Sequence, residues 1–155
     1  MITVVVGCPG IGKSTFAKEN NLFVDLGTLS LTDTFIINKK KQKIFDIKKF
    51  DNKIVLQNTI DRDIENIKDC NIVLLNYINV IDILIKRINF RTKTKKNSKF
   101  IFLLKNSKKL FISNYKSNYF IFNKINKDKI IINIDKNNID NLKNMLMSIH
   151  LKKDK

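Results

Sequence analysis

The stretch Gly7-Cys8-Pro9-Gly10-Ile11-Gly12-Lys13-Ser14-Thr15 decides how the chain is interpreted. It matches the pattern G-x-x-x-x-G-K-[S/T], whose glycines let backbone N–H groups face the phosphates of a nucleotide. The run Ile2-Thr3-Val4-Val5-Val6 before it is short, apolar and β-branched, as expected of a buried parallel strand. Residues 14–19 after it predict the first turns of a helix, whose positive dipole end would also face the phosphates. The stretch therefore predicts a nucleoside triphosphate site formed by residues 7–15.

Two side chains of this stretch have expected roles. The Lys13 ammonium would reach the β- and γ-phosphates, and the Ser14 hydroxyl would hold Mg²⁺. The alternative interpretation is a glycine-rich turn with no ligand. That alternative leaves the lysine and the serine unexplained at the offsets where the phosphate-binding pattern requires them.

Length and composition predict one domain over residues 1–155, with a core of its own. No uncharged apolar run reaches the roughly 18 residues of a membrane span, and the first strand leaves no room for a signal peptide. Cys8 and Cys70 lack metal-ligand spacing and are interpreted as reduced thiols of a cytoplasmic protein. The lone His150, on a predicted C-terminal helix, is expected at the surface.

The formal charge of +16 suggests nucleic acid as a partner, but codon usage offers another explanation. Lys, Asn and Ile dominate the chain, and all three have A/T-rich codons. The bias indicates an AT-rich genome, such as that of a virus, a parasite or an endosymbiont; for a virus, the location would be the host cytoplasm. Arginine, the cation best suited to phosphate, occurs only at Arg62, Arg87 and Arg91, so each of these is a candidate for a special role.

Hydrophobic patterning predicts alternating strands and helices along the whole chain. Strands are expected at residues 2–6, 22–25, 53–57, 71–77 and 129–134, and helices at 13–20, 61–69, 80–88, 100–119 and 139–149. The apolar run that opens residues 100–119 also suits a strand. Residues 92–99 are expected to form a mobile loop. The order predicts a three-layer α/β/α sandwich around a five-stranded parallel sheet, the fold class of nucleotide kinase-like P-loop proteins.

Ligands of such sheets bind beyond the carboxyl ends of the strands. This places Asp25, residues 57–58, residues 76–79 and residues 135–138 along the same edge as the glycine-rich loop. A carboxylate at Asp25 can accept the proton of an attacking hydroxyl or orient it; the alternative is a cap or turn residue. No N-K-x-D motif follows a strand, which argues against a GTPase.

The segment 79–91 follows the fourth strand and ends with Arg87 and Arg91, four residues apart, before a lysine-rich loop. With the glycine-rich loop, it resembles the small P-loop kinases, a group that includes polynucleotide 5′-hydroxyl, nucleoside monophosphate, gluconate and shikimate kinases. Residues 6–19 look most like phage-type polynucleotide kinases, which favour Gly-Cys-Pro-Gly-x-Gly-Lys-Ser-Thr. The strand-and-lid likeness is weaker and extends over most of the chain.

The resemblance implies ATP and Mg²⁺ as cofactors, a lid around residues 87–99, and Arg87 and Arg91 as the arginines that close over the phosphates. One departure stands out, because family members often carry an acidic residue where this chain has Gln57-Asn58-Thr59. For Arg62, a contact with substrate and a position in an exposed helical turn stay equally open. Asp63 is interpreted as a first-turn residue that the helix dipole favours. Of the lysines in the loop, Lys93, Lys95 and Lys96 are candidates for phosphate contacts or for a solvated surface.

The function expected from these features is an ATP-dependent kinase that transfers the γ-phosphate to a nucleotide or to a polynucleotide 5′-hydroxyl. Its catalytic residues would be Lys13, Asp25, Arg87 and Arg91. Two alternatives stay open: a kinase of a small metabolite, and a non-catalytic ATP-binding accessory module. The sequence leaves open the acceptor, the donor base and the oligomeric state.

Overall fold

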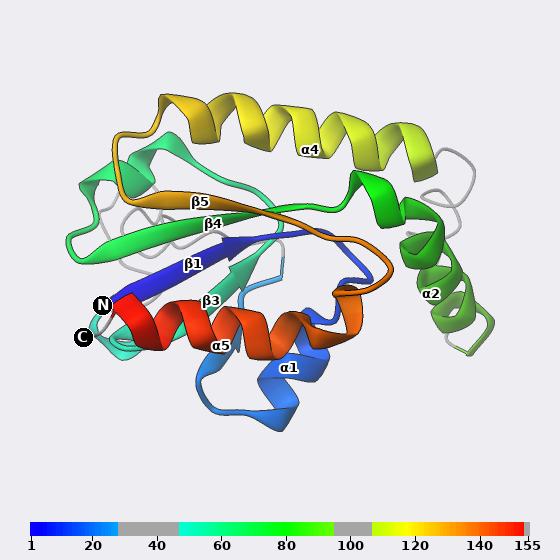
Figure 1. The fold of residues 1–155 in the computed structure, drawn as a ribbon, viewed down its shortest axis with the longest axis horizontal. Helices are drawn as coiled ribbons and strands as arrows, with labels where there is room; N and C mark the ends of the chain where they lie inside the picture. The colour runs from blue at the N-terminus through cyan, green and yellow to red at the C-terminus, as the bar shows by residue number, and fades with distance from the viewer. Residues whose placement is uncertain (28–46, 95–106, 154–155) are drawn as a thin grey trace, which may run out of the picture.

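The computed structural model describes residues 1–27, 47–94 and 107–153, and it confirms an α/β fold built on a parallel sheet (Figure 1). The strands are β1 (Ile2–Val6), β2 (Phe23–Asp25), β3 (Ile54–Gln57), β4 (Cys70–Asn76) and β5 (Lys129–Asn133). The α-helices of the described residues are α1 (Lys13–Glu19), α2 (Ile81–Thr94), α4 (Ser107–Lys124) and α5 (Leu142–Lys153). Short 3₁₀ helices are η2 (Ile47–Phe50), η3 (Arg62–Asn66), η4 (Ile78–Val80) and η5 (Ile139–Asn141).

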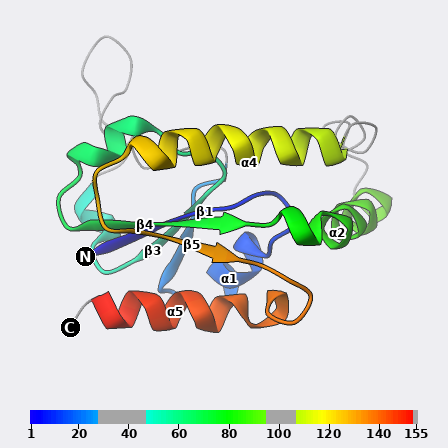
Figure 2. The ribbon, with the colours of Figure 1, turned by 45° about the horizontal axis from the view of Figure 1, so that its top comes forward.

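All five strands run parallel in the order β2-β3-β1-β4-β5. The central strand β1 is buried along its whole length, because β3 and β4 flank its edges and helices cover both faces of the sheet. Figure 2 shows α4 along one face and α1 with α5 along the other. A strand with no solvent-facing side has no need for alternating polar residues, which explains the continuous Ile-Thr-Val-Val-Val run.

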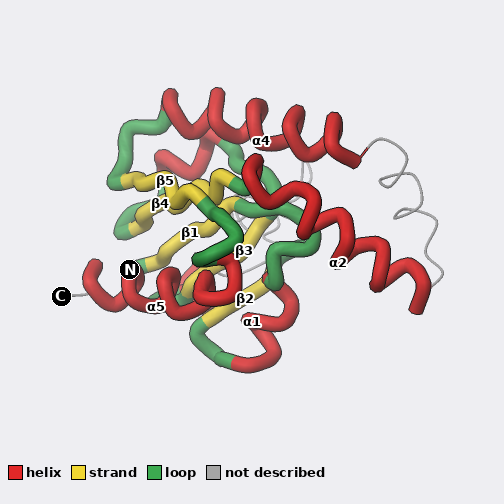
Figure 3. Tube along the Cα trace, turned by 45° about the vertical axis from the view of Figure 1, so that its right-hand side comes forward, coloured by secondary structure: helices red, strands yellow, loops and turns green. Residues whose placement is uncertain are grey.

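The chain changes direction across the sheet at β1. From β1 it moves to the edge strand β2, returns to β3 beside β1, and then crosses to β4 on the other side. Such a switch point opens a crevice at the carboxyl end of the central strand. Figure 3 shows α2 at this end of the sheet, and the first and last described residues lie at the opposite end.

Several element boundaries differ from the sequence-based expectations. Residues 62–66 form the short 3₁₀ helix η3, where an α-helix was expected. Residues 92–94, expected in a loop, continue the helix α2. Residues 95–99 of the expected lid loop, with Lys95 and Lys96, lie outside the described residues, as do residues 100–106 of the next expected helix.

The expectation for His150 was wrong, because its side chain is buried and only 1% exposed. Its Nδ1 lies 2.7 Å from the Thr3 hydroxyl oxygen on β1, and its Nε2 lies 3.0 Å from the Asn52 carbonyl oxygen. The Thr3 hydroxyl in turn donates to Asn71 Oδ1 on β4, at 2.8 Å. The imidazole thus ties α5 to the end of the sheet that lies away from the glycine-rich loop.

No helix of the described residues has the length and apolar character needed to cross a lipid bilayer.

Candidate functional site

The glycine-rich loop leaves the carboxyl end of β1 and turns sharply into α1. Gly10 and Gly12 have φ values of 84° and 111°, which side-chain-bearing residues rarely adopt. A Cβ atom on Gly10 would also lie only 3.2 Å from the Leu84 carbonyl oxygen of α2. Two glycines therefore bring the loop close against α2 and let α1 begin at Lys13, with Gly12 as its N-cap. The first N–H groups of such a helix have no acceptor within it and are able to bind an anion.

The predicted phosphate-binding side chains lie where this loop meets α1. Lys13 is 8% exposed, and its Nζ donates a hydrogen bond of 2.5 Å to the Cys8 carbonyl oxygen within the loop. Ser14 and Thr15 are exposed in the first turn of α1. Burial raises the pKa of the Cys8 thiol to about 12, although the nearby Lys13 charge lowers it in part. The Cys8 thiol is thus an uncharged group of the loop, and Lys13 supplies the positive charge of the loop.

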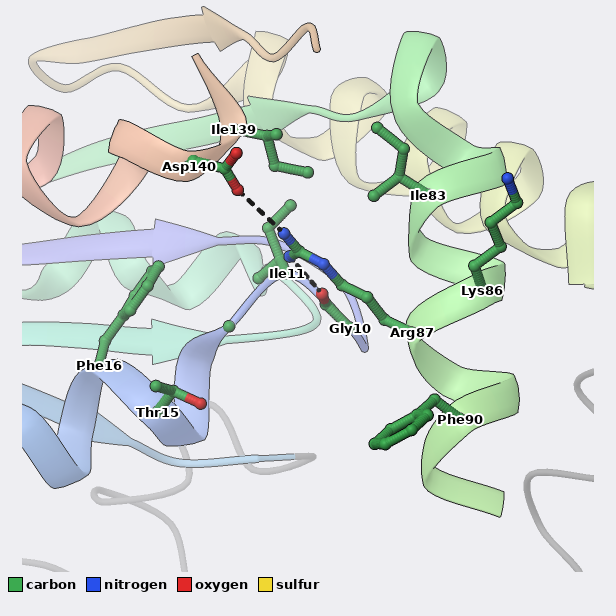
Figure 4. A pocket seen from close by; sticks show the side chains of 11 residues that line it. Gly10, Ile11, Thr15, Phe16, Ile83, Lys86, Arg87, Phe90, Ile139 and Asp140 are labelled. Carbon is green, nitrogen blue, oxygen red and sulfur yellow. Dashed lines mark hydrogen bonds and ion pairs between the residues drawn. The ribbon is translucent and has the colours of Figure 1, made fainter. Parts of the chain in front are cut away.

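A cavity of about 560 Å³ opens beside the loop, within the usual size range of ligand pockets. The glycine-rich loop and α1 form one side, α2 forms another and η5 forms a third (Figure 4). Its lining residues are Gly10, Ile11, Gly12, Thr15, Phe16, Ile83, Lys86, Arg87, Phe90, Ile139 and Asp140. The cavity thus combines the loop with two cations, one carboxylate and an aromatic ring that is 71% exposed, Phe90.

Arg87 crosses this cavity from α2, as Figure 4 shows. Its Nη1 donates to the Gly10 carbonyl oxygen at 3.0 Å, and its Nη2 lies 3.5 Å from Asp140 Oδ1. The ion pair is weak by its setting, because the Asp140 side chain is 88% exposed. Arg87 therefore lies against the loop, as predicted. An anion of higher charge density can replace its contacts with the Gly10 carbonyl and the Asp140 carboxylate.

Arg91 lies one turn farther along α2, at the same helical face as Arg87 by its spacing. The described part of the structure includes its backbone only. Lys93 also belongs to the helical part of the expected lid, residues 87–94.

Asp25 ends β2 at the same edge of the sheet as the loop, but it does not line the large cavity. Its Oδ1 accepts the Gly27 N–H at 2.9 Å, which is the turn role weighed as the alternative. Strand spacing of about 4.8 Å places β2 about 10 Å from β1, since β3 lies between them. The structure brings Lys13 and Arg87 to the loop together, and it leaves Asp25 two strands away with β3 between them.

The tip of β3 carries amides where the resemblance expects an acidic residue. Gln57 is 1% exposed, and its Nε2 donates to the Thr59 carbonyl oxygen at 2.8 Å. The Gln57 carbonyl oxygen accepts the Gly7 N–H at 2.9 Å, which joins β3 to the start of the loop. Asn58 Oδ1 is buried and has no hydrogen-bond partner among the residues that the structure describes. Gln57 is thus a structural support of the loop, and Asn58 carries the orphaned polar atom.

The Asp61-Arg62-Asp63 cluster lies away from the large cavity. Asp61 caps η3 by accepting the Asp63 N–H at 3.1 Å, and all three residues are exposed. The local geometry supports the turn interpretation for the two aspartates. Arg62 does not line the large cavity.

Sequence reasoning missed Phe90 and Asp140. Phe90 follows Arg87 by three positions, so helical spacing could have placed it on the same face. Asp140 belongs to η5, which directly follows residues 135–138, the turn expected at the same sheet edge as the loop; its contact with Arg87 was not expected.

Tyr77 was missed as well. It is buried at the end of β4, where its hydroxyl donates to the Phe111 carbonyl oxygen of α4 and accepts from Asn114 Nδ2. Burial raises the pKa of the Tyr77 phenol, so the phenol stays neutral and links β4 to α4 by hydrogen bonds.

Mg²⁺ is the metal that the glycine-rich loop implies. Ser14 offers an exposed hydroxyl in the first turn of α1, and phosphate oxygens and water commonly supply the other ligands of this ion. This donor set fits Mg²⁺ held by the Ser14 hydroxyl together with a bound triphosphate. Among the described residues, no three His, Cys, Asp or Glu side chains gather as a metal cluster.

No protein-family model matches this chain, and no curated protein does either.

Proposed function

We propose that this protein is an ATP- and Mg²⁺-dependent phosphotransferase that acts on a nucleotide or a polynucleotide 5′-hydroxyl. One observation carries the proposal: the Gly10–Gly12 turn and the start of α1 lie at the switch point of the sheet, with Arg87 against the loop. The backbone amides of the loop, the buried Lys13 within it and Arg87 in the adjoining cavity suit a triphosphate. We also propose that the fold belongs to the nucleotide kinase-like class of P-loop proteins.

In this mechanism ATP supplies the transferred phosphoryl group, and Mg²⁺ neutralises charge on its oxygens. Lys13 exchanges the Cys8 carbonyl oxygen for the β- and γ-phosphates, and Ser14 holds the metal. Arg87 exchanges Gly10 and Asp140 for the γ-phosphoryl oxygens, where charge develops in the transition state. Arg91, one turn on, would assist as a second cation.

Asp25 is assigned the acceptor hydroxyl. Its carboxylate orients this hydroxyl and takes up its proton as the oxygen–phosphorus bond forms and the bond to the ADP oxygen breaks. The acceptor would then lie beyond the tip of β3, because β3 separates Asp25 from the loop within the sheet.

The test is transfer of γ-labelled phosphate from ATP to a panel of 5′-hydroxyl oligonucleotides, nucleoside monophosphates and sugar acids. Lys13→Ala should abolish labelling, whereas Lys18→Ala, an exposed lysine of the same helix, should leave it unchanged. Arg87→Gln should slow transfer by about 10³–10⁵-fold, the usual effect of losing such an arginine. Asp25→Asn should cost about 10²–10⁴-fold, with Asp51→Asn as the matched exposed control.

A panel on which no acceptor is labelled while ATP still binds would contradict the phosphotransferase. The second candidate, a non-catalytic ATP-binding module, would then be favoured. Its supporting observations are the Asp25 carboxylate held in a turn and the amide, rather than acidic, tip of β3.

Within the enzyme proposal, the salt dependence of KM separates the classes of acceptor. The KM for an oligonucleotide should rise steeply with ionic strength, whereas a small acceptor, including a small metabolite, should respond little.

A further inference from the structure

Helix α4 carries an exposed stripe of lysines and one aromatic ring. Lys109, Ser113, Lys116, Phe120 and Lys124 are all exposed and follow one another at offsets of four, three, four and four residues. Such spacing places them on one face of a helix. The opposite face of α4 packs on the sheet through Phe111, Tyr115 and Phe122, which are buried. We propose that this α4 stripe binds single-stranded nucleic acid.

The charge of the stripe selects the partner. The 18 residues of α4 include no Asp or Glu, so its lysines have no acidic neighbour within the helix. Of the carboxylates of η3, Glu65 accepts the Asn126 N–H at 3.0 Å just past the end of α4, and on the packed side of the helix Asn118 Oδ1 accepts the Ile60 N–H. A composition bias alone would scatter lysines over all surfaces. Here three lysines share one face with an exposed ring, and a polyanion complements that face.

The ring of the stripe points to a nucleic acid rather than to another polyanion. Phe120 is 61% exposed, and Lys124 Nζ lies 4.0 Å from its centroid. Beside the stripe, Tyr119 is 41% exposed and stacks on Tyr115 at a centroid separation of 5.9 Å. Exposed rings set among cations are the platform on which unpaired bases stack, whereas a duplex keeps its bases inside. The structure thus pairs a backbone-binding row with base-stacking surfaces.

The stripe also has a suitable length and position. From Lys109 to Lys124 it extends about 22 Å at the helical rise, which matches about six nucleotides at stacked spacing. On another side of α4, its first turns line a cavity of about 270 Å³ together with Pro9 of the glycine-rich loop and Asn58, through Leu110, Phe111 and Asn114. A strand that passed around the start of α4 into this cavity would end beside the loop. This last link rests on the proposed kinase, whereas the binding surface itself does not.

The experiment measures binding of a fluorescent oligodeoxythymidine of about twelve nucleotides, within the usual site sizes, by anisotropy and without ATP. The triple variant Lys109→Gln, Lys116→Gln, Lys124→Gln should weaken binding at least tenfold. It should also reduce the slope of log K against log salt by about 2, at about 0.7 for each phosphate contact. Phe120→Ala should weaken binding about tenfold with an unchanged salt slope, because a neutral stacking contact is lost.

Matched variants separate this site from bulk charge. Lys18→Gln, Lys49→Gln, Lys152→Gln removes the same charge from other exposed positions, and Leu151→Ala removes an exposed apolar side chain from α5. Both should bind like the parent protein. Thermal melts check that every variant is folded.

Equal losses in the two lysine triples would overturn the proposal. So would equal affinity for a duplex of the same length, or tighter binding to phosphatidylserine vesicles through the same lysines. The Lys13→Ala protein should bind the oligonucleotide normally. If phosphate transfer fails while the oligonucleotide still binds through α4, the phosphotransferase proposal is refuted and the proposed binding surface on α4 is retained.

Discussion

The two cysteines show how burial of one atom makes the whole protein sensitive to pH. Cys8 and Cys70 are 0% and 7% exposed, and burial raises the pKa of each thiol to about 12. An unfolded thiol loses its proton near pH 8.5. Above that pH the unfolded chain binds fewer protons than the folded chain, so the free energy of unfolding falls as pH rises. Each thiol can contribute up to about 1.4 kcal/mol per pH unit between about pH 9 and 12.

We therefore expect urea midpoints to hold steady from pH 7 to 8 and to fall between pH 9 and 10.5. The double variant Cys8→Ala, Cys70→Ala should start lower, because it loses packing, and should show a shallower decline. Tyr77 contributes in the same direction near pH 10 and above, since burial also raises its pKa, and it is present in both proteins. Parallel declines in parent and variant would contradict the assigned cause.

At the scale of the element, α4 depends on a lysine outside it. Lys129 of β5 donates to the carbonyl oxygens of Phe122 at 2.7 Å, Asn123 at 3.2 Å and Ile125 at 2.8 Å. Phe122 and Asn123 belong to the last turn of α4 and Ile125 follows it, and the Phe122 carbonyl also accepts the Ile125 N–H at 3.3 Å. The cation supplies donors to the end of the helix and complements the negative end of its dipole. Lys129→Met keeps the apolar stem and removes the donors, so it should lower the free energy of unfolding by about 1–2 kcal/mol.

Urea denaturation measures this change. Lys152→Met, in the last turn of α5, is the control and should change stability by less than about 0.5 kcal/mol, as exposed substitutions do. A loss at Lys129 no greater than that of the control would show that α4 ends without help from β5.

Elements also differ in how far the sequence predicts them. The strands β1, β3 and β4 are short apolar runs between turn residues, and their burial on both faces makes their pattern unmistakable. The stretch 62–66 has helical spacing, but Asp61 caps a turn so short that only a 3₁₀ helix forms. Residues 92–94 have polar side chains typical of loops, but they extend a helix that is already nucleated, where each added residue costs little.

At the scale of the whole molecule, local sequence patterns do not predict which distant residues come into contact. The loop of residues 7–15 is predictable because strand, turn and helix follow one another directly in the chain. Arg87 is predictable only through a family resemblance, and its contact with Asp140 depends on η5 returning across the sheet. His150 was assigned to the surface because its partners, Thr3 and Asn52, are distant in sequence and meet only when α5 packs on the sheet.

The large cavity forms only when distant segments of the chain assemble. The proposed ligand would contact the loop after β1, α2 through Arg87 and η5 through the surrounding cavity, three segments that unfolding separates. A ligand that binds only the folded chain adds about 2.7 kcal/mol at one hundred times its Kd. For a domain of this size, Mg²⁺–ATP at that concentration should raise Tm by about 5–11 °C. Lys13→Ala should lose this shift, and Lys18→Ala should keep it.

Asp140→Asn gives the sharper comparison, because it removes the anion beside Arg87 and leaves the shape of the cavity. Without ligand its Tm should change little, since an exposed ion pair contributes at most about 1 kcal/mol. With a fixed, subsaturating concentration of Mg²⁺–ATP its Tm shift should exceed that of the parent protein, because the triphosphate no longer competes with a carboxylate for Arg87. An equal or smaller shift would mean that Arg87 stays on the Gly10 carbonyl and does not turn toward the phosphates. A shift retained in Lys13→Ala would place the ligand away from the loop altogether.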